Sequence, residues 1–144
     1  MKAGALHHVA VAVPSLDDAL PFYTRTLGLA AGPVHDLTEQ GVRAVFVGAA
    51  GALLELIEPT DPGSGVGRFV AERGRGTLHH VCYVVDDLAS RLRELAAAGV
   101  ELVDAAPRRG ALGDVAFLHP RASGGVLVEL LDRATLRAPH TGEG

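Results

Sequence analysis

The sequence has 144 residues, the size of one ordinary domain with a sizeable hydrophobic core. It is 48% hydrophobic and 21% charged, which is close to the composition of soluble globular domains. The formal net charge is −4, and no basic stripe with interleaved aromatic residues occurs, so the composition argues against a nucleic-acid-binding role.

The first half of the chain predicts one strand, one helix and three further strands. Residues 8–13 alternate between small and larger apolar side chains, which indicates a strand. Ser15 is a suitable N-cap for a helix over 16–27, Pro21 is expected near its start, and Gly28 is a natural C-terminal stop. Three apolar runs follow, at 31–36, 42–47 and 52–57.

The second half repeats this pattern at a fixed spacing. The tetrapeptide Leu-His-His-Val occurs at 6–9 and again at 78–81, an offset of half the chain length. The apolar pattern continues at the same offset through the pairs Val11/Tyr83, Val13/Val85, Leu16/Leu88 and Leu20/Leu92. A helix is expected at about 88–98 and strands at 101–104, 115–118 and 126–131, so we interpret the chain as an internal duplication.

The predicted fold is α+β, built from two tandem βαβββ modules in a single domain over residues 1–144. Module one covers about 5–58, a connector with a short helix covers about 59–76, and module two covers about 77–132. Neither half has enough apolar residues to form an independent core. The remaining segment, 133–144, ends in Pro, Thr and Gly residues and is expected to be a flexible tail.

Each module supplies one histidine and one carboxylate at matching places. His8 and His80 open equivalent strands, whereas Glu55 and Glu129 lie inside otherwise apolar runs once a two-residue insertion is allowed. A carboxylate in an apolar strand is costly unless it is paired, protonated or bound to a metal. Solvent-facing glutamates and ordinary packed histidines are the alternative, but the duplication favours a divalent metal site with mixed nitrogen and oxygen ligands.

The tandem histidines leave one ambiguity. Neighbouring residues of a strand point to opposite faces, so only one member of each pair is expected to line a shared cavity. The pattern alone does not choose between His7 with His79 and His8 with His80.

Three other residues carry weaker signals. Glu39 precedes a strand in a loop, where a carboxylate is usually solvated. Cys82 lies in an apolar strand and suits packing better than ligation, and as the single cysteine it cannot form an intramolecular disulfide. His119 is explained by a turn at the end of a strand. The sequence lacks signal-peptide, transit-peptide and membrane-span patterns, so we expect a cytoplasmic protein without a membrane partner.

The sequence resembles the methylmalonyl-CoA epimerase family of the vicinal-oxygen-chelate superfamily from Leu6 to Leu131. The superfamily-wide signals are the paired Leu-His-His-Val segments and the two strand glutamates. The more specific segments are Glu-Gln-Gly-Val at 39–42, Pro-Arg-Arg-Gly at 107–110, Phe-Leu-His-Pro at 117–120 and Gly-Gly-Val-Leu-Val-Glu-Leu at 124–130. The family often has Gln at the position of Glu55.

The resemblance implies a glyoxalase-like fold with a cup-shaped active site. It assigns His8, Glu55, His80 and Glu129 as ligands of one divalent metal ion (Co, Mn, Ni or Zn), with Glu39 and Glu129 as the acid/base pair. It further implies an acyl-CoA substrate epimerised at the carbon between a carboxylate and a thioester. Such proteins are often homodimers.

Related functions remain as alternatives at this stage. A glyoxalase-type isomerase shares the metal arrangement, so substrate assays must discriminate it. An extradiol-type dioxygenase uses two histidines and one carboxylate, which is one ligand fewer than this chain offers. Non-catalytic drug-binding proteins of the resistance type generally lack the complete ligand set.

Overall fold

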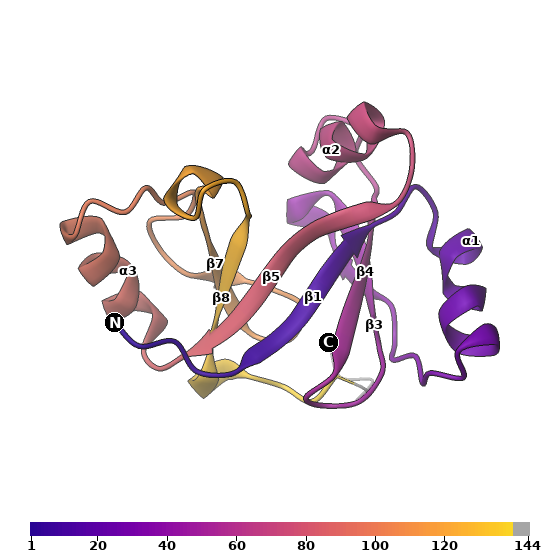
Figure 1. Ribbon diagram of the computed structural model, residues 1–144, viewed down its shortest axis with the longest axis horizontal. Helices are drawn as coiled ribbons and strands as arrows, with labels where there is room; N and C mark the ends of the chain where they lie inside the picture. The colour runs from indigo at the N-terminus through magenta and orange to yellow at the C-terminus, as the bar shows by residue number, and fades with distance from the viewer. Residues whose placement is uncertain (140–144) are drawn as a thin grey trace.

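The computed structural model describes residues 1–139 and shows one mixed β-sheet with helices packed against it (Figure 1). The strands are β1 (Leu6–Ala12), β2 (His35–Leu37), β3 (Val42–Val47), β4 (Leu53–Pro59), β5 (Thr77–Val85), β6 (Arg108–Arg109), β7 (Asp114–Leu118) and β8 (Val128–Asp132). The α-helices are α1 (Leu16–Pro21), α2 (Gly65–Arg73) and α3 (Leu88–Ala97). A π-helical turn (Phe22–Thr26) and 3-10 turns at Thr38–Gln40, Pro120–Ala122 and Arg133–Thr135 complete the elements.

The eight strands follow the order β2-β3-β4-β1-β5-β8-β7-β6, so the two modules meet at the centre of the sheet. There β1 and β5 run antiparallel, side by side, with α1 and α3 at opposite ends of the molecule (Figure 1). In their register Val9 pairs with Val81, its own counterpart in the second module. The duplication predicted from the sequence is therefore a two-fold arrangement about the β1/β5 pair, and the predicted pair of βαβββ modules is confirmed.

Equivalent residues build the core beneath each module's helix. Alternation along each strand sends every second side chain to the helix-covered face of the sheet. The core beneath α1 contains Val13, Leu16, Val45, Val47 and Leu56, and the core beneath α3 contains Val85, Leu88, Leu92, Ala116 and Leu130. The opposite face carries further apolar side chains, such as Phe46 and Ile57, together with buried histidines and glutamates.

The prediction of one regular α-helix over 16–27 is wrong for the second half of that segment. The regular α-helix ends at Pro21, which lies at its last position instead of near its start. Proline has no N–H to donate within the helix, and the chain continues as a π-helical turn in which the Leu27 N–H donates to the Phe22 carbonyl. Gly28 then ends the helical region in the left-handed conformation, with φ of 69°.

Two edge strands also differ from expectation. Only β2, at His35–Leu37, forms where a strand over 31–36 was predicted. In module two the run 101–104 makes an isolated bridge at Leu102, and the edge strand is β6, at Arg108–Arg109. An edge strand pairs with a neighbour on one side only, so the local sequence pattern specifies its position and length less strongly than for a central strand.

The first part of the segment expected to be a flexible tail is attached to the body. Thr135 Oγ1 accepts from the Asp114 N–H at 2.8 Å, and Arg137 Nη2 donates to the Ala111 carbonyl at 2.9 Å. Residues 140–144, the rest of that predicted tail, lie outside the described residues. Among the helices within residues 1–139, none is long and apolar enough to cross a membrane.

Glu58 connects the start of α1 to the sheet. Its Oε2 accepts from the Leu16 N–H at 2.7 Å, and its Oε1 accepts from Arg43 Nε at 3.2 Å. Burial raises the pKa of Glu58, but these two hydrogen bonds outweigh burial and lower it overall. We expect Glu58→Ala to lower the free energy of unfolding by about 1–3 kcal/mol, because the buried Leu16 amide loses its acceptor. Urea denaturation measures this, with the exposed Glu72→Ala as a control that stays near wild type.

Candidate metal centre and active site

Strand alternation places one histidine and one glutamate from each module on the same face of the sheet. His8, Glu55, His80 and Glu129 are all buried, at 4–7% exposure. On β4, Leu54 and Leu56 face the α1 core, so Glu55 between them faces the opposite side. Val128 and Leu130 flank Glu129 in the same manner on β8.

The register of the sheet shows that the two glutamates are structural counterparts. Glu55 pairs with Ala10 across β1/β4, and Glu129 pairs with Cys82 across β5/β8. Ala10 and Cys82 are equivalent positions of the repeat, separated by the same number of residues as His8 and His80. The same separation carries Glu55 to Leu127, which lies two positions before Glu129. The two-residue insertion inferred from the sequence therefore lies between β5 and β8 in module two.

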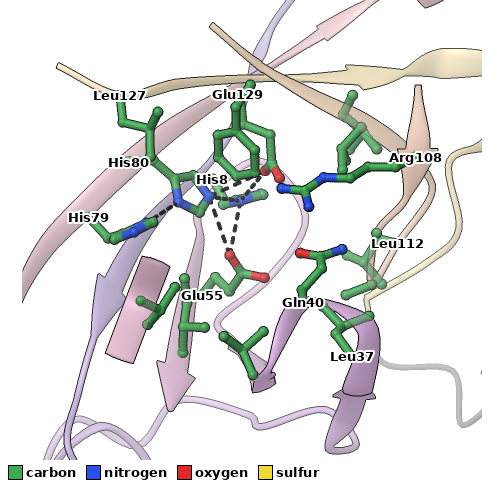
Figure 2. A pocket seen from close by; sticks show the side chains of 18 of the residues that line it. His8, Leu37, Gln40, Glu55, His79, His80, Arg108, Leu112, Leu127 and Glu129 are labelled. Carbon is green, nitrogen blue, oxygen red and sulfur yellow. Dashed lines mark hydrogen bonds and ion pairs between the residues drawn. The ribbon is translucent and has the colours of Figure 1, made fainter. Parts of the chain in front are cut away.

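The donor atoms of the four residues converge in Figure 2. The two Nε2 atoms of His8 and His80 are 3.3 Å apart. Glu55 Oε1 lies 3.4 Å from each of them, and Glu129 Oε1 lies 3.3 Å from each. The second histidine of each tandem pair therefore belongs to the cluster, as the family resemblance implies.

These spacings fit a divalent ion. Ligand atoms about 2.1 Å from an ion lie about 3.0–3.4 Å apart at bond angles between about 90° and 109°. The N···N and N···O separations of 3.3–3.4 Å fall in this range. Donor atoms of His8, His80 and Glu129 all lie within 4.8 Å of one another, a group that does not include Glu55, whose carboxylate is close to the two histidine nitrogens alone. Two imidazoles and two carboxylates suit Co, Mn, Ni or Zn.

Without an ion, the charges in the cluster must balance through protons. Burial alone lowers the pKa of His8 and of His80, but the ion pairs with Glu129 and Glu55 outweigh it and raise the two pKa values to about 10 and about 9. Burial raises the pKa of Glu55, yet its bonds to both histidines lower it to about 2. The pKa of Glu129 is likewise lowered, mainly by His80. The metal-free cluster consequently holds two imidazolium–carboxylate pairs at neutral pH.

The first histidines of the tandem pairs have the opposite character. Burial is the main cause that lowers the pKa of His7 and of His79 to about 4, and the positive charge of the adjacent His8 or His80 adds to it. Each Nδ1 lies close to the Nδ1 of its neighbour, at 2.7 Å for His7 and 2.8 Å for His79. The two rings of each pair therefore do not point to opposite faces. His79 lines the cavity described below together with His80, contrary to expectation, whereas in the first pair only His8 lines it, as expected.

These shifts predict a pH optimum for the stability of the metal-free protein. Raised pKa values at His8 and His80 stabilise the fold below pH 6.5, and this contribution is lost as the pH rises towards 9–10. Lowered pKa values at His7 and His79 destabilise the fold as the pH falls from 6.5 towards 4.

In urea titrations with a chelator we expect a maximum near pH 6.5 and an alkaline loss on the order of a few kcal/mol. Saturating Zn²⁺ should remove the alkaline loss, because the ion takes the place of the two protons. A stripped protein equally stable at pH 6.5 and 9.5 would contradict the prediction.

A cavity of about 300 Å³ opens above the cluster. Most of its wall is apolar, formed by Val42, Phe46, Ile57, Leu112, Val115, Phe117, Leu127 and Leu131. Gln40 and Arg108 bring polar groups into it, facing the carboxylates in Figure 2. The Arg108 guanidinium lies 5.5 Å from the Phe117 ring centroid, and the Phe117 ring packs edge-on against His80. An apolar cavity with a few convergent polar groups is typical of small-molecule sites.

Glu39, the predicted second acid/base residue, is not brought into this cavity. It is exposed on the 3-10 turn Thr38–Gln40 and lines a neighbouring hollow. The hollow shares Leu37, Gln40, Gly110 and Ala111 with the cavity above the cluster, so the two spaces adjoin. Gln40 faces the cluster, and its Nε2 donates to the Arg109 carbonyl at 2.8 Å.

Gln40 and Arg108 are pocket residues that the sequence analysis missed. Arg108 lies in the Pro-Arg-Arg-Gly segment, where nothing local distinguishes it from Arg109 as a pocket residue. Gln40 carried no independent signal, because a glutamine in a loop is ordinary. Both were nevertheless quoted within segments that carried the family resemblance.

Cys82 and His119 have structural roles. The Cys82 side chain is fully buried against Val115 and Leu131, and burial raises the pKa of its thiol, so it remains protonated although it lies near His7 and His8. His119 caps the 3-10 turn after β7, where its Nδ1 accepts from the Arg121 N–H at 3.1 Å.

Two βαβββ modules in one curled sheet, with two histidines and two carboxylates on its inner face, define a glyoxalase-type metal-site protein. The model of the glyoxalase/bleomycin resistance protein/dioxygenase superfamily matches residues 7–117. Mouse mitochondrial methylmalonyl-CoA epimerase is 40% identical over 130 residues, which cover 90% of this chain and 73% of that protein. Ethylmalonyl-CoA/methylmalonyl-CoA epimerase of Cereibacter sphaeroides is 38% identical over 88% of this chain and 96% of its own length.

Solved structures agree with the sequence relatives. A methylmalonyl-CoA epimerase in complex with methylmalonyl-CoA and NH4⁺ has a TM-score of 0.85 and 31% identity, covering 96% of this chain and all of that chain. The epimerase from Mycobacterium tuberculosis has a TM-score of 0.81 and 32% identity, with 92% of each chain covered. The chain belongs to the methylmalonyl-CoA epimerase family of the glyoxalase superfamily.

Proposed function

We propose that this protein is a metal-dependent epimerase that interconverts (2R)- and (2S)-methylmalonyl-CoA or a close 2-carboxyacyl-CoA. The observation that carries the proposal is the buried cluster of His8, Glu55, His80 and Glu129 at the base of an apolar cavity. The cluster offers the donor spacing of a divalent ion, and the cavity is open to a small acyl group. Relatives that carry this activity in their names align over most of the chain.

The residues present fit a bound metal ion and a proton-transfer reaction. The ion, held by His8, Glu55, His80 and Glu129, would act as a Lewis acid that stabilises the negative charge developing on the thioester oxygen. Apolar walls at Phe46, Phe117 and other residues offer water few partners, and a bound acyl group that displaced water would strengthen electrostatic interactions in the cavity. The substrate offers a C–H between a carboxylate and a thioester carbonyl, the bond that is acidified by such stabilisation.

Inversion requires one group to remove the proton and another to return it from the opposite face. Glu129 is the proposed base on one side, since its carboxylate is buried at the base of the cavity and a bound divalent ion would keep it ionised. Glu39 is the proposed partner on the other side. Its turn borders the same cavity through Gln40, and Gly41 after it has φ of 68°, a conformation that gives the turn a defined end.

Proton NMR in D₂O tests the proposed function directly. The metal-loaded protein should exchange the α-proton of either methylmalonyl-CoA epimer for deuterium and interconvert the two, and chelation should stop both reactions. If the protein holds one metal ion per chain and exchanges neither epimer, the epimerase assignment is wrong. Ethylmalonyl-CoA and the glutathione hemithioacetal of methylglyoxal are the next substrates, the second one addressing glyoxalase-type isomerisation.

We also infer that the protein is cytoplasmic and forms a homodimer. The homodimer is what the family resemblance implies. Sedimentation equilibrium tests the dimer, and a mass equal to one chain at micromolar concentration would contradict it.

A further inference from the structure

The two tandem histidine pairs lie at matching irregularities of the central strand pair. Leu6 pairs with Tyr83 and His8 with Cys82, so β1 advances by two residues where β5 advances by one. Ala10 pairs with His80 and Val11 with Leu78, so β5 advances by two residues where β1 advances by one. His7 and His79 are therefore the extra residues of two symmetric bulges. A β-bulge breaks the alternation of side chains and re-aims the residue that it inserts.

The re-aimed rings make the same contact in both modules. Nδ1 of His7 is 2.7 Å from Nδ1 of His8, and Nδ1 of His79 is 2.8 Å from Nδ1 of His80, the contact drawn in Figure 2. Two nitrogens at this distance share one proton in a hydrogen bond. The same two atoms are in contact at equivalent bulges of both modules, which indicates a conserved arrangement within the repeat and not chance packing of neighbours.

The direction of each hydrogen bond follows from the chemistry of imidazole. A neutral imidazole carries one N–H donor and one acceptor nitrogen. If Nε2 of His8 and His80 offers its lone pair to an ion, the remaining proton must be on Nδ1. Each Nδ1–H then donates to the outer histidine, which accepts with Nδ1 and carries its own proton on Nε2.

We propose that His7 and His79 are positioning residues of the metal site, each fixing the tautomer and the ring orientation of the adjacent ligand histidine. This inference rests on the metal site of the proposed function. Hydrogen bonds to the second nitrogen of ligand histidines typically determine the tautomer and contribute about 10–100-fold to metal affinity.

The outer rings are themselves held in place. His79 packs edge-on against Phe69 of α2 with ring centroids 4.8 Å apart, and the Arg73 guanidinium covers Phe69 at 3.8 Å. On the other side, Phe46 lies 6.3 Å from His7 and 5.2 Å from His8, measured between ring centroids. An acceptor with a fixed position can hold its donor more firmly than water can.

Long-range proton–nitrogen NMR correlation on the zinc-loaded, ¹⁵N-labelled protein reads the tautomers directly. We expect His8 and His80 to carry the proton on Nδ1, and His7 and His79 to carry it on Nε2. Outer histidines that are protonated on Nδ1, or ligand histidines whose Nδ1 is unprotonated, would overturn the proposal.

A matched pair of substitutions tests the energetic effect. His79→Leu removes the acceptor, whereas His79→Asn keeps an acceptor oxygen at nearly the place of Nδ1. In competition with a chromophoric chelator, without substrate, we expect Zn²⁺ to bind about 10–100-fold more weakly to the Leu variant and with near wild-type affinity to the Asn variant. His7→Leu and His7→Asn should repeat the result through the second pair.

Three outcomes separate the fate of this proposal from that of the proposed function. A wild-type protein that epimerises its substrate, together with four variants that all bind Zn²⁺ as tightly as wild type, overturns the positioning role alone. Asn variants as weak as the Leu variants, with unchanged free energies of unfolding for the apo forms, also overturn it. A protein with the expected tautomers and affinities but without exchange of methylmalonyl-CoA instead removes the epimerase assignment and leaves the positioning role.

Discussion

Glu129→Gln is expected to abolish interconversion of the methylmalonyl-CoA epimers. The substitution keeps the size of the side chain but removes the carboxylate that accepts the proton, and general acid–base catalysis contributes about 10²–10⁴-fold. The glutamine also weakens the metal centre, since Glu129 Oε1 lies 3.3 Å from both ligand histidine nitrogens. The rate of α-proton exchange at saturating Zn²⁺ measures the loss.

Glu55→Gln is the matched control, because Glu55 occupies the equivalent place in the other module. An amide oxygen can replace Glu55 as a neutral ligand, and one negative charge less leaves a stronger Lewis acid at the ion. We therefore expect Glu55→Gln to retain metal binding and substantial exchange. Equal losses in the two variants would show that Glu129 acts only as a ligand and would remove it as a base.

Glu39→Gln is expected to separate proton exchange from inversion. With Glu129 intact, one epimer should still exchange its α-proton for deuterium with retention of configuration, because its C–H faces the remaining base. The other epimer should be inert, and interconversion should fall by about 10²–10⁴-fold. Incubation of each pure epimer in D₂O, followed by NMR and chiral analysis, measures both quantities.

Glu72→Gln, an exposed substitution on α2, is the control for Glu39→Gln and should behave as wild type. The structure makes the result informative, because Glu39 is exposed beside the cavity whereas Gln40 faces into it. If Glu39→Gln still interconverts the epimers at the wild-type rate, proton return belongs to another group and the two-base assignment is wrong.

The internal symmetry suggests how one module specialises without changing the fold. Glu55 and Glu129 share a strand position, a burial of 7% exposed and contacts to the same two histidine nitrogens. Their surroundings differ: β4 continues towards Glu58 and the anchor of α1, whereas β7, beside β8, carries Phe117 close to Arg108. These differences distinguish the two glutamates, and the comparison of Glu129→Gln with Glu55→Gln tests whether base character belongs to Glu129 alone.

Much of the site was available in the sequence because it depends on local rules. The repeated Leu-His-His-Val segment identified the two modules, and alternation within apolar runs placed Glu55 and Glu129 on one face of the sheet. Burying carboxylates without partners is costly, so two of them in matching strands indicated a shared centre. Helix signals at Ser15 were likewise local, and its side chain does accept from the Asp18 N–H.

Only the tertiary structure decided where the remaining groups point. His7 and His79 face their neighbours because pairing of β1 with β5, strands from the two halves of the chain, inserts a bulge at each of them. Gln40, and not Glu39, lines the cavity because the side chain of Gln40 is held by its hydrogen bond to the Arg109 carbonyl, in a segment far along the chain. Bulges and turn orientation arise from contacts between distant segments, which the periodicity of a single segment does not encode.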